Sequence, residues 1–174
     1  MEEKILIKPI PIDWSKYHRY MSKEGLCGPY TVQMVLSACG IKKSIREISK
    51  HIYKEFYGSP YILIVAYLKK FFVITNYRTG ASISGISAHL RAGHILIINF
   101  WDEDEDGNGD GHYAIISGYE NKVLTFVDSS KERDWTYGMT TKEFKKIWYD
   151  CLVDDNTLWH ENLLIWVDPK SKRV

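Results

Sequence analysis

The chain has 174 residues, of which 45% are hydrophobic and 26% charged, a composition typical of one globular domain. Its 23 Lys and Arg residues nearly balance its 22 Asp and Glu residues, so no basic excess indicates binding to nucleic acid or to an anionic membrane. The amino-terminal stretch MEEKILIKPIPIDW lacks a basic segment followed by an apolar run, and it therefore does not look like a secretory signal. No apolar stretch approaches the ~20 residues that a membrane span requires.

Three cysteines, Cys27, Cys39 and Cys151, cannot all pair with one another. Because no CxxC spacing occurs, the sequence predicts no zinc site, and we expect no metal or cofactor elsewhere. Reduced thiols are typical of cytoplasmic proteins, and we expect that location.

The first half of the chain predicts helices after an extended arm over residues 1–13, where Pro9 and Pro11 exclude a helix. Residues 28–39 carry apolar side chains at positions i, i+3, i+4 and i+7, with Gly40 as the carboxyl cap. Ser44 and Glu47 form the pattern of a capping box before a second helix. Ser59 and Pro60 open a third helix that reaches about residue 71, and a short fourth helix covers residues 84–92.

The second half of the chain changes to strand patterns. Residues 95–100 form a continuous apolar run, and residues 113–119 and 123–128 predict two strands joined by a tight turn. Thr140 and Glu143 predict a further capped helix, and residues 163–167 a last strand. Helices followed by a largely antiparallel sheet indicate an α+β fold. We expect a single domain over residues 1–174.

Cys27 is the first residue with the setting of a nucleophile. It lies between Gly25 and Gly28, directly before a predicted helix. The free N–H groups and the dipole of a helix start favour negative charge, and the thiolate is the reactive form of cysteine. A buried cysteine that packs as a small hydrophobic side chain at the helix cap is the alternative.

His112 and Asp128 stand at the two ends of the predicted hairpin that lie next to each other. His112 begins one strand and Asp128 ends the next, so a carboxylate can accept the imidazole N–H and fix its tautomer. Alone, His112 could be structural and Asp128 a turn cap. A cysteine at a helix start with a histidine and a carboxylate on adjacent strand ends is an arrangement for thiol catalysis.

Several segments resemble, in order, papain-like cysteine peptidases of the bacteriocin-processing, double-glycine leader type. They are CGPYTVQMVLSACGI with SIREISKHI, then SISGISAHLRAGHILIINF, GHYAIISGYENKVLTFVDSS and MTTKEFKKIW, spanning roughly residues 20–150. The resemblance implies a papain-like fold, a peptide or protein substrate, Cys27 as nucleophile, His112 as general base and Asp128 as the orienting carboxylate. It predicts a thiol hydrolase that acts on peptide or amide bonds. The balanced charge, independently, predicts no nucleic acid or membrane as partner.

One position departs from that family. The family carries a glutamine six residues before the nucleophile, where its amide helps to bind the oxyanion, whereas this chain has Met21. A thioether cannot donate a hydrogen bond, so Ser22 or His18 would have to replace that donor. A catalytically weak or inactive relative that binds a peptide segment in the same cleft is therefore the alternative function.

An acidic segment, Asp102 to Asp110, resembles the front of a calcium loop. The glutamate expected at the twelfth position is replaced by Tyr113, and strands rather than helices flank the segment. We interpret it as an acidic turn between strands whose charge favours the imidazolium form of His112. A calcium-regulated binding module is the remaining interpretation.

Overall fold

The computed structural model describes residues 12–23, 25–104, 106–151 and 158–173. Most of the predicted extended arm, residues 1–11, lies outside these described residues. A short 3₁₀ turn at Trp14–Lys16 buries Trp14 and precedes the first helix. A second 3₁₀ turn, Pro169–Ser171, follows the last strand.

Five α-helices lie within the described residues, and all of them were expected from the sequence. They are α1 (Cys27–Ala38), α2 (Ile45–Ile52), α3 (Tyr61–Leu68), α4 (Ile83–Arg91) and α5 (Thr141–Ile147). The capping box of α5 forms as predicted, with Thr140 and Glu143 bonded to each other's backbone N–H groups. The box predicted for α2 forms only in part. Ser44 accepts the N–H of Glu47, but the Glu47 carboxylate bonds Lys43 Nζ at 2.6 Å instead.

Six strands form one antiparallel sheet in the order β1-β8-β2-β3-β4-β5. Their bounds are β1 (Thr75–Arg78), β2 (Ile95–Glu103), β3 (Gly109–Glu120), β4 (Val123–Val127), β5 (Thr136–Thr140) and β8 (Leu164–Val167). A separate pair, β6 (Tyr149–Cys151) and β7 (Leu158–Glu161), forms a two-stranded sheet. The predicted α+β class is thus confirmed. The sequence did not predict β1, β5, β6 and β7.

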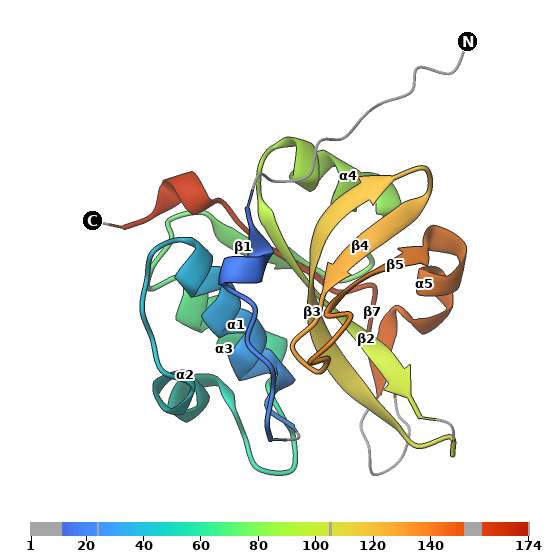
Figure 1. Cartoon of the computed structure of the whole chain (residues 1–174), viewed down its shortest axis with the longest axis horizontal. Helices are drawn as coiled ribbons and strands as arrows, with labels where there is room; N and C mark the ends of the chain where they lie inside the picture. The colour runs from blue at the N-terminus through green and yellow to red at the C-terminus, as the bar shows by residue number, and fades with distance from the viewer. Residues whose placement is uncertain (1–11, 24, 105, 152–157, 174) are drawn as a thin grey trace.

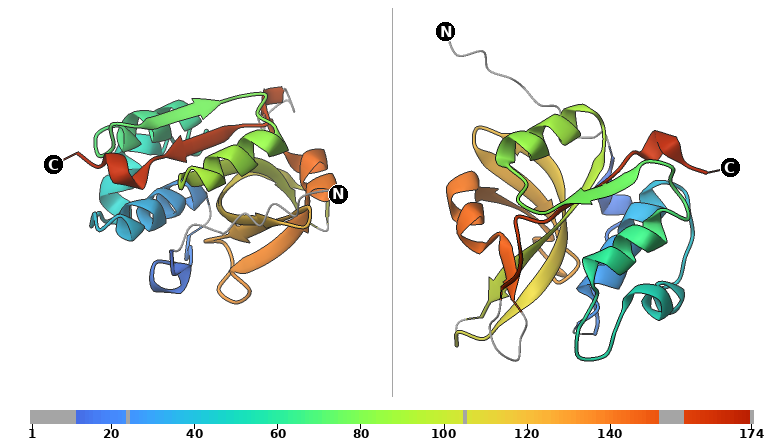
Figure 2. Two further views of the ribbon diagram at one scale, coloured as in Figure 1. Left: turned by 90° about the horizontal axis from the view of Figure 1, so that it is seen from above. Right: turned by 180° about the vertical axis from the view of Figure 1, so that it is seen from behind.

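The central strands bury both of their faces, which explains why five of the six residues at positions 95–100 are apolar. In β2, Ile95 and Ile97 pack into the core with α1, α2 and α3, while Leu96 and Ile98 pack into a second core with α4 and α5. The same alternation continues in β3, as expected when successive side chains point to opposite faces of a sheet. Figure 1 shows α1, α2 and α3 gathered on one side of the molecule and α5 on the other, and Figure 2 shows α4 lying against the strands.

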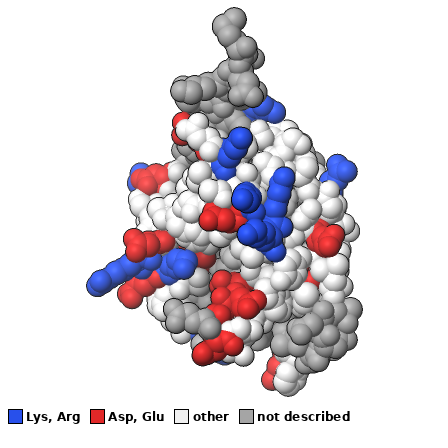
Figure 3. All heavy atoms as spheres, turned by 90° about the vertical axis from the view of Figure 1, so that its right-hand side faces the viewer, with Lys and Arg blue, Asp and Glu red and all other residues white. Residues whose placement is uncertain are grey.

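The surface agrees with the balanced composition. On the face drawn in Figure 3, Lys and Arg side chains lie among Asp and Glu side chains, and neither sign covers the face. Among the helices that the structure describes, none combines the length and apolar character of a membrane span.

Candidate active site

Cys27 is the first residue of α1, so the helix begins one residue earlier than the sequence predicted, and Cys27 is half-buried. The next residue must be a glycine, because a Cβ at Gly28 would lie 2.5 Å from the Cβ of Ser59. This close approach brings the start of α1 against the loop before α3. The N–H groups at a helix start have no partner within the helix, so they are free to donate hydrogen bonds to a group bound beside Cys27.

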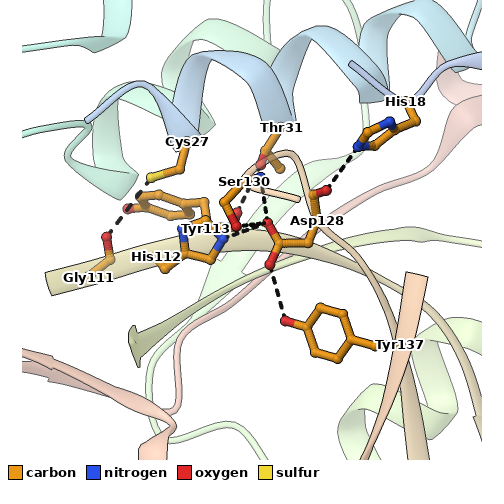
Figure 4. A network of polar contacts seen from close by, with 9 residues as sticks. All are labelled: His18, Cys27, Thr31, Gly111, His112, Tyr113, Asp128, Ser130 and Tyr137. Carbon is orange, nitrogen blue, oxygen red and sulfur yellow. Dashed lines mark hydrogen bonds and ion pairs between the residues drawn. The ribbon is translucent and has the colours of Figure 1, made fainter. Parts of the chain in front are cut away.

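Two contacts hold the start of α1 on β3. Thr31 Oγ1 donates a hydrogen bond to the carbonyl oxygen of Tyr113 at 3.1 Å, and Cys27 Sγ lies 3.9 Å from the carbonyl oxygen of Gly111. The segment from Gly111 to Tyr113 therefore contacts α1 on both sides of His112. Figure 4 shows the imidazole of His112 between Cys27 and the carboxylate of Asp128, the residue after β4.

His112 and Asp128 lie side by side, joined by a hydrogen bond of 2.8 Å between Nε2 and Oδ1. Asp128 directly follows β4, which pairs antiparallel with β3. The position of His112 differs from the prediction in one respect: β3 begins at Gly109, and His112 is paired with Phe100 of β2 inside the ladder. The histidine is thus held by a paired strand rather than by a strand end.

Asp128 has four further hydrogen-bond partners that sequence reasoning missed. Its Oδ1 accepts the N–H and Oγ–H of Ser130 at 2.8 and 2.7 Å, and its Oδ2 accepts the Tyr137 hydroxyl at 3.2 Å. Its backbone carbonyl oxygen lies 3.0 Å from His18 Nε2, and its N–H donates to Trp135 O at 2.8 Å. The run Asp-Ser-Ser was a local signal for Ser130, since an Asp side chain often bonds the backbone two residues later. His18, Trp135 and Tyr137 had no comparable signal.

The hydrogen bonds favour the charged forms of the pair. Burial opposes an imidazolium at His112, but hydrogen bonds with Asp128 and Cys27 outweigh it and raise the His112 pKa to about 10. Burial likewise opposes the Asp128 carboxylate, yet His112 and Ser130 lower the Asp128 pKa to about 2. Burial and the neighbouring Asp128 carboxylate raise the pKa of Tyr137, so its hydroxyl stays a donor. The largest contributions that favour the imidazolium thus come from Asp128 and Cys27.

A cavity of about 340 Å³ opens beside Cys27 and Gly111. Two buried polar side chains, Asn99 and Asp150, form part of its wall. Its aromatic wall consists of Tyr53, Phe56, Tyr57, Tyr113 and Trp159. Such a cavity, apolar on one side with a few polar groups, is typical of a binding site. The sequence analysis identified neither Asn99 nor Asp150 as functional candidates.

The structure brings Met21 toward the loop after Asp128, because the Met21 N–H donates to Ser129 O at 2.7 Å. The two proposed substitutes for the family's glutamine have contacts of their own: His18 Nε2 lies at the Asp128 carbonyl, and Ser22 Oγ is 3.5 Å from Tyr30 Oη. None of these three residues belongs to the described cavity wall.

The described residues of the acidic segment lie where β2 and β3 meet, as predicted, with Asp102 paired with Asp110 and Glu103 with Gly109. The Asp104 carboxylate closes this turn by accepting the N–H groups of Asp106 and Asn108 at 2.9 and 2.8 Å. Among the residues described, no three His, Cys, Asp or Glu side chains form a group that could hold a metal ion.

The fold, with a cysteine at the start of its central helix facing a histidine on the sheet, defines the papain-like class. The sequence matches the model of the "Peptidase_C39 like family" over residues 13–151, which is more than half of the chain. The chain therefore belongs to this family of C39-like peptidases.

Solved structures of such peptidases have the same fold. A protein described as a C39-like peptidase from Bacillus anthracis is 13% identical, with a TM-score of 0.59 over 92% of this chain and 98% of the other. The peptidase domain of Streptococcus ComA, a bi-functional ABC transporter of a quorum-sensing pathway, is 16% identical, with a TM-score of 0.62 over 87% and 98% of the two chains. A double glycine motif protease from an AMS/PCAT transporter, solved in complex with the leader peptide, is 10% identical, with a TM-score of 0.54 over 86% and 89%. No curated protein sequence matches the chain.

Proposed function

We propose that this chain is a thiol hydrolase that cleaves peptide or amide bonds with Cys27 as nucleophile, His112 as general acid–base and Asp128 as the orienting carboxylate. The observation that carries the proposal is the position of the His112 ring between Cys27 and Asp128, with Nε2 bonded to the carboxylate at 2.8 Å. Membership of a peptidase family supports it.

The chemistry follows from this arrangement. The thiolate of Cys27 attacks the carbonyl carbon, and the backbone N–H of Cys27 donates to the oxyanion that forms. His112 gives its proton to the leaving nitrogen as the C–N bond breaks, which leaves a thioester on Cys27. Neutral His112 then takes a proton from water, whose oxygen displaces the sulfur and restores the thiolate–imidazolium pair. Asp128 stays ionised throughout and stabilises the imidazolium.

The substrate we propose is a peptide segment that lies along the cavity beside Cys27. The double glycine motif protease with a similar fold was solved in complex with a leader peptide, which supports a peptide as the class of ligand. The aromatic wall of the cavity also favours a peptide with bulky side chains.

A second candidate is a relative that binds a peptide in this cleft and cuts it slowly or not at all. Met21 favours it, because a methionine side chain at that position cannot donate a hydrogen bond to an oxyanion. Removing one oxyanion donor typically costs ~100- to 1,000-fold in rate.

The test compares two cysteine variants on a panel of fluorogenic peptides. Cys27→Ala should abolish hydrolysis, and mass spectrometry of the native chain should find the acyl group on Cys27. Cys39→Ala is the matched control, since burial raises the Cys39 pKa to about 11 and keeps it a thiol. Hydrolysis that survives in Cys27→Ala would refute the proposed nucleophile. Peptide binding by the native chain without acylation would favour the second candidate.

A further inference from the structure

Asp150 is a buried carboxylate that the proposed reaction does not use. The residue is 4% exposed and forms part of the wall of the cavity that also contains Cys27. Its carboxylate lies directly on Gly111, because a Cβ at position 111 would be 2.3 Å from Asp150 Oδ2 and 2.5 Å from Oδ1. The carbonyl oxygen of the same Gly111 is 3.9 Å from Cys27 Sγ. One residue thus separates the carboxylate from the sulfur.

Asn99 adds a second polar group to the same wall. It is 1% exposed, and neither the nitrogen nor the oxygen of its side-chain amide has a hydrogen-bond partner among the described residues. The amide is near enough to Asp150 to favour the ionised carboxylate, but it does not reach hydrogen-bond geometry. A buried polar group without a partner is costly, so an unpaired amide on a cavity wall indicates a polar ligand.

Asp150 also lacks a protein cation. The described residues contain one ion-pair candidate, His160, whose Nε2 lies 3.9 Å from Asp150 Oδ2. Burial lowers the His160 pKa to about 4, so this ring is neutral at ordinary pH and supplies no charge. A second carboxylate, Asp110, lies on the cavity wall as well. The described part of the wall therefore carries negative charge with no positive charge to balance it.

From this geometry we propose that the cavity is a specificity pocket for a cationic side chain, arginine or lysine, of the peptide substrate, with Asp150 as the counter-charge and Asn99 Oδ1 as a further acceptor. This inference rests on the proposed function, since it names the substrate of the same site. A guanidinium only donates hydrogen bonds, and its planar arrangement of N–H groups matches the two oxygens of a carboxylate.

Two further features of the pocket agree with a cation. Burial, together with the nearby charge of Asp110, raises the Asp150 pKa to about 7. The N–H of Cys151 acts in the opposite direction. A bound cation would stabilise the ionised form that burial disfavours. The rings of Tyr53, Tyr113 and Trp159 line the same cavity, and aromatic faces attract guanidinium and ammonium groups.

The first experiment measures the pocket without catalysis. Benzamidine and its neutral counterpart benzamide are titrated by calorimetry into the native chain at pH 8, where Asp150 is ionised. We expect benzamidine to bind at least about tenfold more tightly, as for a charge pair shielded from water. Asp150→Asn should remove the difference, whereas Glu120→Gln, which neutralises an exposed carboxylate at the end of β3, should keep it.

The second experiment uses the substrate. In a positional series of fluorogenic peptides, arginine is replaced at each position by citrulline, which has nearly the same shape without the charge. We expect kcat/KM to fall at least about tenfold at one position next to the scissile bond. In Asp150→Asn we expect the ratio of kcat/KM for the arginine peptide to that for the citrulline peptide to fall toward one.

The outcomes separate the pocket from the reaction. Equal binding of benzamidine and benzamide by the native chain would overturn the pocket, and this comparison stands even if Asp150→Asn does not fold. Cleavage of peptides without a preference for arginine or lysine at any position would overturn the assignment of a cationic substrate side chain. If benzamidine still bound, the ligand of the pocket would be a separate small cation rather than the substrate. Asp150-dependent binding of benzamidine without cleavage of any peptide would support the pocket and refute the proposed hydrolase.

Discussion

The sharpest prediction concerns Asp128→Asn, a substitution that keeps the volume of the side chain but removes its charge. The amide oxygen can still accept the Nε2 hydrogen bond of His112, so the ring keeps its orientation. What is lost is the negative charge that stabilises the imidazolium. We therefore expect a large change in the protonation of His112 with little change in structure.

The magnitude follows from the pair itself. Mainly through His112 and Ser130, the folded structure lowers the Asp128 pKa from 3.8 to about 2, a difference worth roughly 2.5 kcal/mol. The His112 pKa is raised further, to about 10, because Cys27 contributes as well. We take the smaller difference as the upper bound for the pair, so the His112 pKa in Asp128→Asn should fall by up to about two pH units, toward 8.

The effect on stability has a definite sign. Because the folded pKa of His112 lies above its ordinary 6.5, its contribution is fully present below pH 6.5 and is lost as the pH rises toward 10. Asp128→Asn should thus destabilise the chain most at pH 6, by up to roughly 2.5 kcal/mol, and less at pH 10. Urea denaturation at the two pH values measures this difference.

NMR titration of ¹³C-labelled histidine follows His112 directly and does not depend on activity. The chain has six histidines, and those remote from the site serve as internal controls. A second control is Ser130→Ala, which removes one hydrogen bond to Asp128 but keeps the charge, and which should move the midpoint much less. An unchanged His112 midpoint in Asp128→Asn would refute the electrostatic account of the pair.

The remaining predictions concern other parts of the chain. Met21→Gln should speed acylation of activated esters by at least about tenfold in burst kinetics if position 21 faces the oxyanion, and an unchanged rate would show that it does not. Iodoacetamide near pH 6 should alkylate Cys27 before Cys39, whose pKa burial raises to about 11, as mass mapping would report. Calorimetry should detect no calcium binding to the segment 102–110 tighter than ~0.1 mM, because the closing glutamate is missing. Asp150 has a folded pKa of about 7, above the ordinary 3.8, so stability falls as the pH rises from about 4 to 7. Asp150→Asn should remove this loss, gaining at most roughly 4 kcal/mol at pH 8 and almost nothing at pH 4, as denaturation curves would show.

The sequence predicted the elements whose signals are local. The α5 cap needs only Thr140 and Glu143, and the β3–β4 hairpin needs only two strand patterns and a tight turn. The adjacency of His112 and Asp128 followed from that hairpin. The edge strands β1 and β5 were missed because they are short and largely polar, with few buried positions to set a period of two.

The cavity could not be predicted in the same way, because its polar residues come from distant parts of the chain. Asn99 was visible only as the single polar residue in the apolar run 95–100. Asp150 reaches the site through β6, which pairs with β7 and was itself missed. No hydrophobic periodicity in the sequence predicts that Asn99 and Asp150 line the same cavity as Cys27, because their proximity depends on how the two sheets pack.

The short segment Gly111–His112–Tyr113 lies between Cys27 and the proposed pocket. The carbonyl oxygen of Gly111 lies near Cys27 Sγ, and the Asp150 carboxylate lies against the Gly111 Cα. The carbonyl oxygen of Tyr113 accepts the hydrogen bond of Thr31 Oγ1, and the Tyr113 hydroxyl donates to Ser59 O at 2.8 Å. The segment is paired with β2 along its length, so it cannot adjust one contact freely without moving the others. A group that enters the pocket and displaces Asp150 would therefore press on the strand that positions His112. Under the proposed function, recognition of a substrate side chain and activation of the Cys27 sulfur should therefore vary together.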